Sequence, residues 1–335
     1  MKRQRLKVKK VERICFFIIS GNDRVSQILI TIKLGDSIVI LILFKRKEEI
    51  NMIKKLTDRI YYMPHKEDTD RPSLGVICGN KYSLVVDSGN SPKHAIEFLT
   101  ELDALDIPPL KYLAITHYHW DHIFGIKEMG LVTIANHNTI EKLEEIKKLK
   151  WDDVSLVEHV NQGRFSDFTI ECIKKEITDR DNFEIGELDI TYENSIKIDL
   201  GGLTCIIKSI GGDHTNDASM IYIPEEKVLF LGDCIYGGMY KGVYGYTREK
   251  LFPMIDKILD CDADHYIVSH ENIFDKEGIT DLLNQLKTAG EIVGEDLSNE
   301  EAIKRFSDKY NRVPSEDESF YMKCFADVNG VMLKQ

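Results

Sequence analysis

The sequence THYHWDH at residues 116–122 follows the apolar run YLAI and holds three of the chain's ten histidines. His117 and His119 are two residues apart, so they point the same way if the run ends as a strand. Asp121 and His122 are adjacent at the expected start of a helix, so they diverge from the first pair. Imidazole and carboxylate are donors that Zn²⁺ accepts. Burying four of them on one turn requires a cation, and the segment therefore predicts a metal site.

Three more donors occur farther along the chain, each at the end of an expected strand. His214 follows LTCIIKSI, Asp233 ends the run KVLFLGD, and His270 follows HYIVS. In layered α/β domains the ends of strands gather along one rim, where binding sites are usually built. These three side chains are therefore predicted to join the heptad.

The remaining pattern indicates a layered α/β or α+β domain, in which short β-branched runs alternate with helical stretches. LGVICG and YSLVVDS, separated by Asn80 and Lys81, predict a hairpin. Ser91 and Pro92 predict the start of a helix that extends to about Ala104. Further helices are expected at 121–129, 139–151, 166–178, 247–260 and 277–292, and a capping box at Ser298 and Glu301 opens another.

The ordered set H-x-H-x-D-H, a lone His after glycine, G-D and a strand-terminal His resembles the metallo-β-lactamase fold superfamily, over roughly residues 56–285. The resemblance implies an α/β (α+β) four-layer αββα sandwich with two metal sites. It implies a first metal held by His117, His119 and His214. It implies a second held by Asp121, His122 and His270, with Asp233 as a bridge between them.

The resemblance also implies supporting and catalytic roles. Asp87, in LVVDSGN, matches a position that orients the metal-binding motif, with a turn residue that ends the strand as the alternative. Apart from the resemblance, Thr116 is expected to support the ligands, and Thr215 either supports them or belongs to an ordinary turn. Two metals about 3.5–4 Å apart would lower the pKa of a shared water and create a bridging hydroxide. Asp121 would hold or accept its proton, and Asp233 would also be catalytic.

Tyr236 completes a D-x-x-Y spacing with Asp233 that resembles lactonase-like members, in which the tyrosine donates a hydrogen bond to the substrate. The alternative is a packed aromatic loop, since Tyr240, Tyr244 and Tyr246 follow closely. Cys234 should point away from the site, because successive residues of an extended segment face opposite sides.

Position 119 also bears on the metal. Diiron flavoprotein relatives carry Glu there, so His119 favours two Zn²⁺ ions, with iron or manganese as the other options. The remaining histidines have no donors nearby and are expected to be structural or on the surface: His65, His94, His137, His159 and His265.

The leading functional hypothesis is a dinuclear zinc hydrolase that acts on a small ester, thioester or lactone, as in the glyoxalase II and lactonase branches. A phosphodiesterase or nuclease and a mononuclear iron dioxygenase are the alternatives. The formal net charge of -12 argues against a nucleic-acid partner. A small-molecule substrate is the expected partner, and a homodimer is a further option.

Charge and apolar runs suggest the domain organisation. Residues 1–51 hold 12 Lys and Arg against 5 Asp and Glu, whereas the remaining residues hold 32 against 51. The runs ICFFIIS and IVILILF are much shorter than the roughly 18 apolar residues of a membrane span. Residues 1–51 are therefore interpreted as a dispensable or non-native extension before Met52, which follows codons that can resemble a bacterial ribosome-binding site. The hydrolase domain is expected over 52–290 and a helical segment over 291–335.

Seven scattered cysteines without a CxxC pair predict reduced thiols and a cytoplasmic location.

Overall fold

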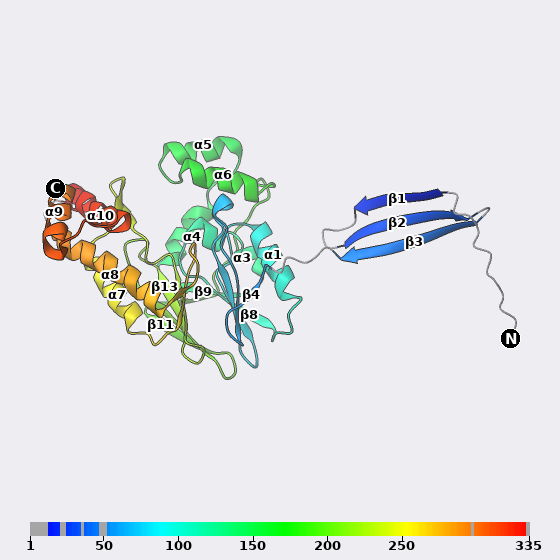
Figure 1. Cartoon of the computed structure of the whole chain (residues 1–335), viewed down its shortest axis with the longest axis horizontal. Helices are drawn as coiled ribbons and strands as arrows, with labels where there is room; N and C mark the ends of the chain where they lie inside the picture. Colours follow the sequence, from blue (N-terminus) through cyan, green and yellow to red (C-terminus); the bar gives the residue numbers. More distant parts are fainter. Residues whose placement is uncertain (1–12, 21–24, 35–36, 47–51, 296–297, 333–335) are drawn as a thin grey trace. The chain divides into compact units, whose positions relative to one another are not determined.

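The computed structural model describes residues 13–20, 25–34, 37–46, 52–295 and 298–332 (Figure 1). The chain divides into two units, Met1–Asn51 and Met52–Gln335. In the first unit, three strands form an antiparallel sheet in chain order: β1 (Arg13–Ser20), β2 (Val25–Leu34) and β3 (Ser37–Arg46).

The second unit contains two large sheets. The first has the order β10-β9-β8-β7-β6-β5-β4 and the second the order β11-β12-β13-β14-β17-β18. The strands of the first sheet are β4 (Lys54–Lys55), β5 (Ile60–Met63), β6 (Leu74–Cys78), β7 (Ser83–Val86), β8 (Leu110–Ala114), β9 (Val132–Asn136) and β10 (Ile190–Tyr192). Those of the second are β11 (Ser195–Asp199), β12 (Thr204–Ser209), β13 (Ser219–Ile223), β14 (Val228–Gly232), β17 (His265–Val268) and β18 (Phe274–Asp275), and a separate hairpin is formed by β15 (Gly238–Tyr240) and β16 (Val243–Gly245).

Helices cover the outer face of each sheet (Figure 1). The first sheet carries the 3-10 turn η1 (Glu67–Thr69) and the helices α1 (Pro92–Leu102), α2 (Trp120–Ile123), α3 (Ile126–Met129), α4 (Thr139–Lys147), α5 (Asp153–Asn161) and α6 (Asp167–Glu176). The second carries α7 (Arg248–Leu259), α8 (Lys276–Val293), α9 (Asn299–Tyr310) and α10 (Glu316–Met332).

Three apolar clusters hold these layers together. One contains Leu84 and Ile134 from the first sheet with Ile221 from the second, so it fills the space between the sheets. The other two pack each helical layer on its own sheet. The arrangement is the predicted four-layer αββα sandwich, and it brings the ends of strands from both sheets to a common rim.

Local sequence signals place most elements where they were expected. The Ser91 side chain accepts a hydrogen bond from the backbone of His94, and Pro92 opens α1. Ala95, Phe98 and Leu102 are buried along one face of that helix, as an amphipathic pattern requires. The predicted hairpin is the antiparallel β6–β7 pair.

The helix expected at 121–129 is instead two single turns, α2 and α3, because the chain bends at Gly125. A Cβ at that position would lie 2.1 Å from the carbonyl oxygen of Ser88, so only glycine permits this close approach. The helix expected at 139–151 ends at Lys147. Helix α5 was not predicted from the sequence, although the side chain of Asp152 caps its start.

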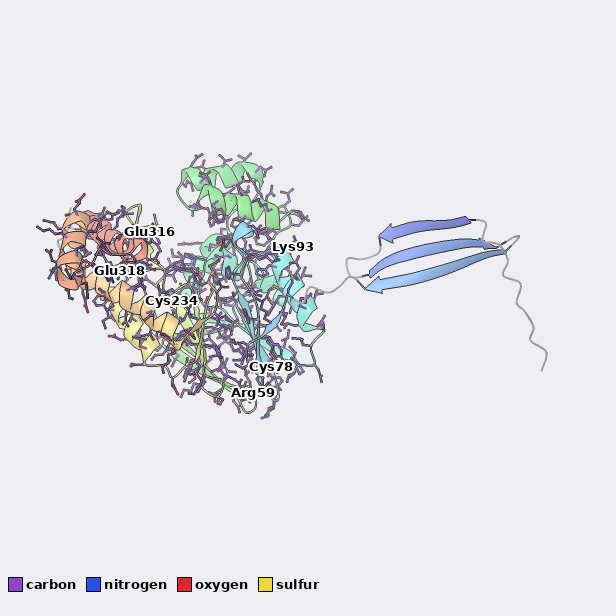
Figure 2. The ribbon with its side chains drawn as sticks, viewed as in Figure 1. Arg59, Cys78, Lys93, Cys234, Glu316 and Glu318 are labelled. Carbon is purple, nitrogen blue, oxygen red and sulfur yellow. The ribbon has the colours of Figure 1, made fainter. Side chains whose placement is uncertain are left out.

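The C-terminal helices share the core of the second sheet. Leu286, Phe306 and Phe325 are buried in one cluster, and the expected boundary at residue 290 falls inside α8. The predicted capping box at Ser298 opens α9. Arg312, in the segment after α9, donates two hydrogen bonds to Glu318 of α10, which is labelled in Figure 2.

The cysteines that the structure describes outside the N-terminal unit are free and scattered among the layers. Cys78 and Cys234, both labelled in Figure 2, belong to different apolar clusters. In the part of the chain that the structure describes, no helix has the length and apolarity needed to cross a bilayer.

Candidate metal centre

The predicted ligands lie at the strand ends of both sheets. In the first sheet, β7 and β8 run parallel and lead to Asp87 and to the heptad. In the second sheet, β14 and β17 also run parallel, and Asp233 and His270 follow them. Because parallel strands end at the same edge, both sheets deliver polar side chains to one rim.

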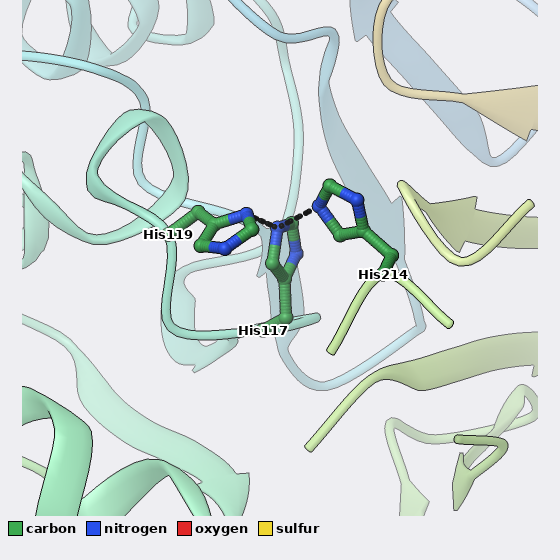
Figure 3. A group of neighbouring side chains, drawn as sticks. All are labelled: His117, His119 and His214. Atoms are coloured by element: carbon green, nitrogen blue, oxygen red, sulfur yellow. Dashed lines mark hydrogen bonds between the residues drawn. The ribbon is translucent and has the colours of Figure 1, made fainter. Parts of the chain in front are cut away.

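His117, His119 and His214 form the first group of ligands, drawn in Figure 3. His117 Nε2 lies 3.1 Å from His119 Nδ1 and 3.2 Å from His214 Nε2. All three donor atoms lie within 4.8 Å of one another, so a single ion could contact all of them.

Asp121, His122, Asp233 and His270 form the second group, whose donor atoms also lie within 4.8 Å of one another. Asp121 Oδ2 lies 3.0 Å from His122 Nε2 and 3.1 Å from His270 Nε2. The expectation that Asp121 and His122 turn away from the first pair agrees with this separation.

Asp233 faces both groups. Its Oδ2 atom is 3.5 Å from His214 Nε2 in the first group and 3.6 Å from His270 Nε2 in the second. Its Oδ1 atom is 3.6 Å from His122 Nε2. A carboxylate in this position has the geometry that a bridging ligand needs.

The protonation states of the first group suit a metal. Burial, reinforced by the neighbouring imidazoles, lowers the pKa of His117 well below its usual value. Burial likewise lowers the pKa of His119 to about 3 and the pKa of His214 below its usual value. All three rings are therefore neutral at physiological pH, which is the form that binds metals.

The second group holds opposite charges. Burial opposes ionisation of Asp121 and Asp233, but the nearby histidines outweigh it and keep both carboxyl pKa values well below normal. Burial also lowers the pKa of His270, but Asp233 and Asp121 raise it to about 11. Without a metal the buried carboxylates are thus neutralised by protonated histidines, and a bound cation would take over that role while protons leave.

A buried donor atom also fits a metal. Asp233 Oδ1 is fully buried and makes no hydrogen bond in the described part of the chain, and His122 Nε2 lies 3.6 Å from it. Buried polar atoms are normally paired, because an unpaired one costs about 1–3 kcal/mol. A divalent ion in the second group would satisfy this atom.

Asp87 and Thr116 fix the orientation of the first ligands. Asp87 accepts hydrogen bonds from the Thr116 backbone at 2.7 Å and from the Thr116 hydroxyl at 2.9 Å. His122 Nδ1 lies 2.9 Å from Asp87 Oδ2, and His117 Nδ1 lies 3.1 Å from Thr116 Oγ1. A proton on each Nδ1 atom leaves the Nε2 atoms of His117 and His122 free for a metal.

Close packing against Thr116 explains why the residue before the ligand Asp233 is a glycine. Gly232, directly before Asp233, has φ +54°, and a Cβ there would lie 2.7 Å from the Thr116 side chain. The absence of a side chain allows the end of β14 to approach Thr116 from the other sheet. Thr215 is different: its buried hydroxyl makes no hydrogen bond to a ligand residue within the described segments.

Two cavities open onto the site. The first, here the α4–α6 cavity, has a volume of about 600 Å³ and is lined by members of both ligand groups, by the apolar side chains of Ile146, Leu149 and Phe165, and by charged side chains such as Lys142 and Arg164. The second, here the β15–β16 cavity, has a volume of about 990 Å³ and is lined by His119, His214, Asn138, Asn216, Tyr240 and Lys250. The two cavities meet at the first ligand group, because the following residues belong to both linings: Tyr118, His119, Lys142, His214 and Tyr236.

Tyr236 lies beside the ligands. Its ring centre is 6.1 Å from that of His214 and 6.5 Å from that of His270. Burial raises the pKa of its phenol, so the hydroxyl stays protonated and can donate. Cys234 is buried in the core of the second sheet, which agrees with the expectation that it points away.

The sequence did not predict a role for Asp70. Its carboxylate Oδ1 lies 3.6 Å from His270 Nδ1, on the side of the ring opposite to Asp121. It follows η1 in the left-handed region, with φ 55°, and lines the α4–α6 cavity. The only available signal was a short acidic turn, which does not indicate a partner so far along the chain.

A buried ion pair holds this turn. Arg71 donates two hydrogen bonds to Glu176, at 2.9 and 2.7 Å, and one to Glu97 at 2.5 Å. The network ties the segment after η1 to the end of α6 and to α1. It was also absent from the sequence prediction.

The other histidines do not join the ligand groups among the described residues. His265 begins β17, at the opposite end of the strand from His270, as expected. His94 is fully buried on α1, where burial lowers its pKa well below normal.

Known proteins resemble this chain in sequence and in fold. A family model described as the metallo-beta-lactamase superfamily matches residues 69–270. Beta-lactamase-like protein 2 homolog of Caenorhabditis elegans is 25% identical over 197 residues, which cover 58% of this chain and 53% of that protein. The chain thus spans about half the length of this relative.

Solved structures share the fold at low identity. A metallo-beta-lactamase family protein from Thermus thermophilus aligns with a TM-score of 0.50 and 14% identity, covering 84% of this chain and 95% of that one. The sec-alkylsulfatase Pisa1 from Pseudomonas sp. aligns with a TM-score of 0.52 and 12% identity, covering 83% of this chain and 48% of that one. At these identities the similarity shows the fold alone.

Proposed function

Because this chain belongs to the metallo-β-lactamase superfamily, we propose that it is a dinuclear zinc hydrolase that cleaves a small ester, thioester or lactone. The observation that carries the proposal is the pair of ligand groups, with the Asp233 carboxylate between them and a cavity in front. His117, His119 and His214 would hold one ion. Asp121, His122 and His270 would hold the other.

Two bound ions would supply Lewis acidity and a water of lowered pKa beside the reacting carbonyl. The chain's own residues do the rest. The nearby histidines keep the pKa of Asp121 well below normal, so its carboxylate is ionised and would hold the attacking water by accepting a hydrogen bond from it. Tyr236 lines the cavity, and its protonated hydroxyl, which lies 3.5 Å from Glu271 Oε1, would donate a hydrogen bond to a substrate oxygen.

Zinc is favoured because position 119 holds His, where diiron flavoprotein relatives carry Glu, and because zinc accepts the imidazole and carboxylate donors of both groups. A small acyl substrate is favoured over a nucleic acid because the chain carries a formal net charge of -12.

The test is metal analysis of the purified protein, combined with assays on ester, thioester, lactone and phosphodiester substrates before and after chelation. We expect two zinc ions per chain and an acyl hydrolysis that a chelator abolishes and added zinc restores. Activity confined to phosphodiesters would replace the proposal with the nuclease alternative. One iron per chain with dioxygen consumption would replace it with the dioxygenase alternative.

A further inference from the structure

The loop that carries the ligand His214 also carries a buried acidic residue that belongs to neither ligand group. Asp213 directly precedes His214 and is 5% exposed. Its Oδ1 atom accepts hydrogen bonds from the Tyr240 hydroxyl at 2.5 Å, from the Thr247 hydroxyl at 2.8 Å and from the Thr247 backbone at 3.0 Å. These three bonds offset the cost of burying the carboxyl group, and they join the loop to two other segments.

The bonds of Asp213 hold the β15–β16 hairpin against the His214 loop. Tyr240 is the last residue of β15, and Thr247 is the residue before α7. The hairpin also approaches the loop through its backbone, because a Cβ at Gly238 would lie 2.0 Å from the carbonyl oxygen of Asp213. Only glycine permits this approach. The hairpin therefore packs directly against the residue that precedes the ligand.

The same hairpin segment reaches the ring of His214. Burial lowers the pKa of His214, whereas a hydrogen bond with the backbone of Gly237, the residue before β15, raises it. A bond that raises the pKa of an imidazole is one that the ring donates. His214 Nε2 faces Asp233 at 3.5 Å, so the other ring nitrogen makes this bond. Such a bond fixes the tautomer and the direction of a ligand histidine, and it leaves Nε2 for the metal.

We propose that Asp213 is a positioning residue for the first metal: its carboxyl group holds the β15–β16 hairpin where the hairpin backbone orients the ring of His214. The inference rests on the metal pair of the proposed function and not on its substrate. The support for His122 comes from the first sheet through Asp87, so it is independent of the hairpin. Loss of the Asp213 bonds should therefore act mainly on the first ion.

The experiment measures the release of the two zinc ions separately, by chelator titration of the metal-loaded protein. His119→Ala and His270→Ala each remove a ligand from a different group, so they assign the two release steps. Tyr240→Phe removes only the hydroxyl that bonds to Asp213. We expect it to weaken the first ion about tenfold, the low end of the 10–100-fold loss typical of outer partners of metal ligands, and the second ion much less. Equal weakening of both ions, or of neither, would overturn the inference.

Two variants of Asp213 test whether the acceptor atom is responsible. All three bonds end on Oδ1, so Asp213→Asn keeps an acceptor in place and should retain most of the affinity for the first ion. Asp213→Ala removes the acceptor and should weaken the first ion at least about tenfold. Asparagine that behaves as alanine does would contradict the hydrogen-bond account.

Tyr222→Phe is the matched control for the loss of a tyrosine hydroxyl. The Tyr222 hydroxyl donates to the backbone carbonyl of Asp262 at 2.9 Å, and Tyr222 lines neither of the two cavities. Its loss should change neither release step. Urea denaturation of each metal-free variant measures general stability, and a first-ion loss in Tyr240→Phe that Tyr222→Phe reproduces would overturn the inference.

Failure of the hydrolase proposal would look different. Metal-loaded wild-type protein would then cleave no acyl substrate, while the two release steps and their response to Tyr240→Phe would still be measured. Conversely, acyl hydrolysis by the wild type together with an unchanged first release step in Tyr240→Phe would overturn the role of Asp213 alone.

Discussion

The metal-binding rim and the helical wall of the α4–α6 cavity adjoin one another, yet they depend on the sequence in different ways. The rim collects single side chains from strand ends in two sheets, and each has a fixed chemical task. The wall is built from the end of α4, the segment after it and the segment before α6, where Ile146, Leu149 and Phe165 contribute apolar surface. Changes at the rim should therefore act on metal binding and catalysis, whereas changes in the wall should act on stability and selectivity.

The largest effect is expected from Asp233→Ala, which removes the carboxylate shared by both ligand groups. We expect kcat/KM to fall by at least about a thousand-fold, which corresponds to about 4 kcal/mol of lost transition-state stabilisation. Metal analysis should show fewer than two ions per chain. Asp262→Ala, at an exposed position, is the matched control. Full activity of Asp233→Ala with two bound ions would break the distinction between rim and wall.

The second-largest effect is expected at the buried ion pair between Arg71 and Glu176, which ties the segment after η1 to α6. Glu176→Gln leaves buried Arg71 with only Glu97 as a charged partner. We expect a loss of about 3 kcal/mol in the free energy of unfolding, measured by urea denaturation, with metal content unchanged. Glu171→Gln, on the exposed face of the same helix, should have little effect.

The pH dependence of this loss has a definite sign. Burial raises the pKa of Glu176, but the Arg71 hydrogen bonds outweigh it and lower the pKa below the usual value of 4.5. Such a group stabilises the fold above its unfolded pKa and loses that contribution as pH falls through its folded pKa. The difference between the two proteins should be complete near pH 7 and shrink below about pH 4.5. A difference that grows in acid would contradict the ion-pair account.

Asp87→Asn tests the support behind the rim. Asparagine tolerates the φ of 60° at this position, but its amide cannot accept from Thr116 and His122 as a carboxylate does. We expect a 10–100-fold loss of metal affinity, measured by competition with a chelator. Asp106→Asn, in an exposed loop, is the control. Wild-type affinity in Asp87→Asn would show that the ligands orient themselves without it.

The sequence was most informative where chemistry restricts residue type. His117, His119, Asp121 and His122 could be recognised together because four donors rarely occur at that spacing unless they bind a metal. Strand-end positions then connected them with the distant ligands. The layered fold followed from the alternation of apolar runs and helical stretches, together with capping signals such as Ser91 and Ser298.

The cavity wall was not predictable in the same way. Many apolar residues can form a wall, so Leu149 and Phe165 carry no distinguishing pattern. α5 was missed because only Leu156 and His159 are buried along it, which leaves a weak helical periodicity. Asp70 depends on a left-handed turn and on a partner brought close only by the complete fold.

The smallest effect is therefore expected at the boundary between the two regions. Asp70→Asn keeps the shape and the left-handed backbone but removes the negative charge that faces His270 Nδ1. Because this contact is 3.6 Å long and its carboxylate is 30% exposed, we expect less than a tenfold fall in kcat, with KM nearly unchanged. Asp68→Asn, on the exposed side of the same turn, is the control.

The split between kcat and KM decides what Asp70 does. As part of the cavity wall it would affect substrate binding, so Asp70→Asn would raise KM and leave kcat intact. As a residue that orients His270 it would lower kcat and weaken the second ion more than the first in a chelator titration. A change confined to KM would show that Asp70 acts as part of the cavity wall and not as a support for the metal ligands. The second ligand group would then need no support on that side of His270.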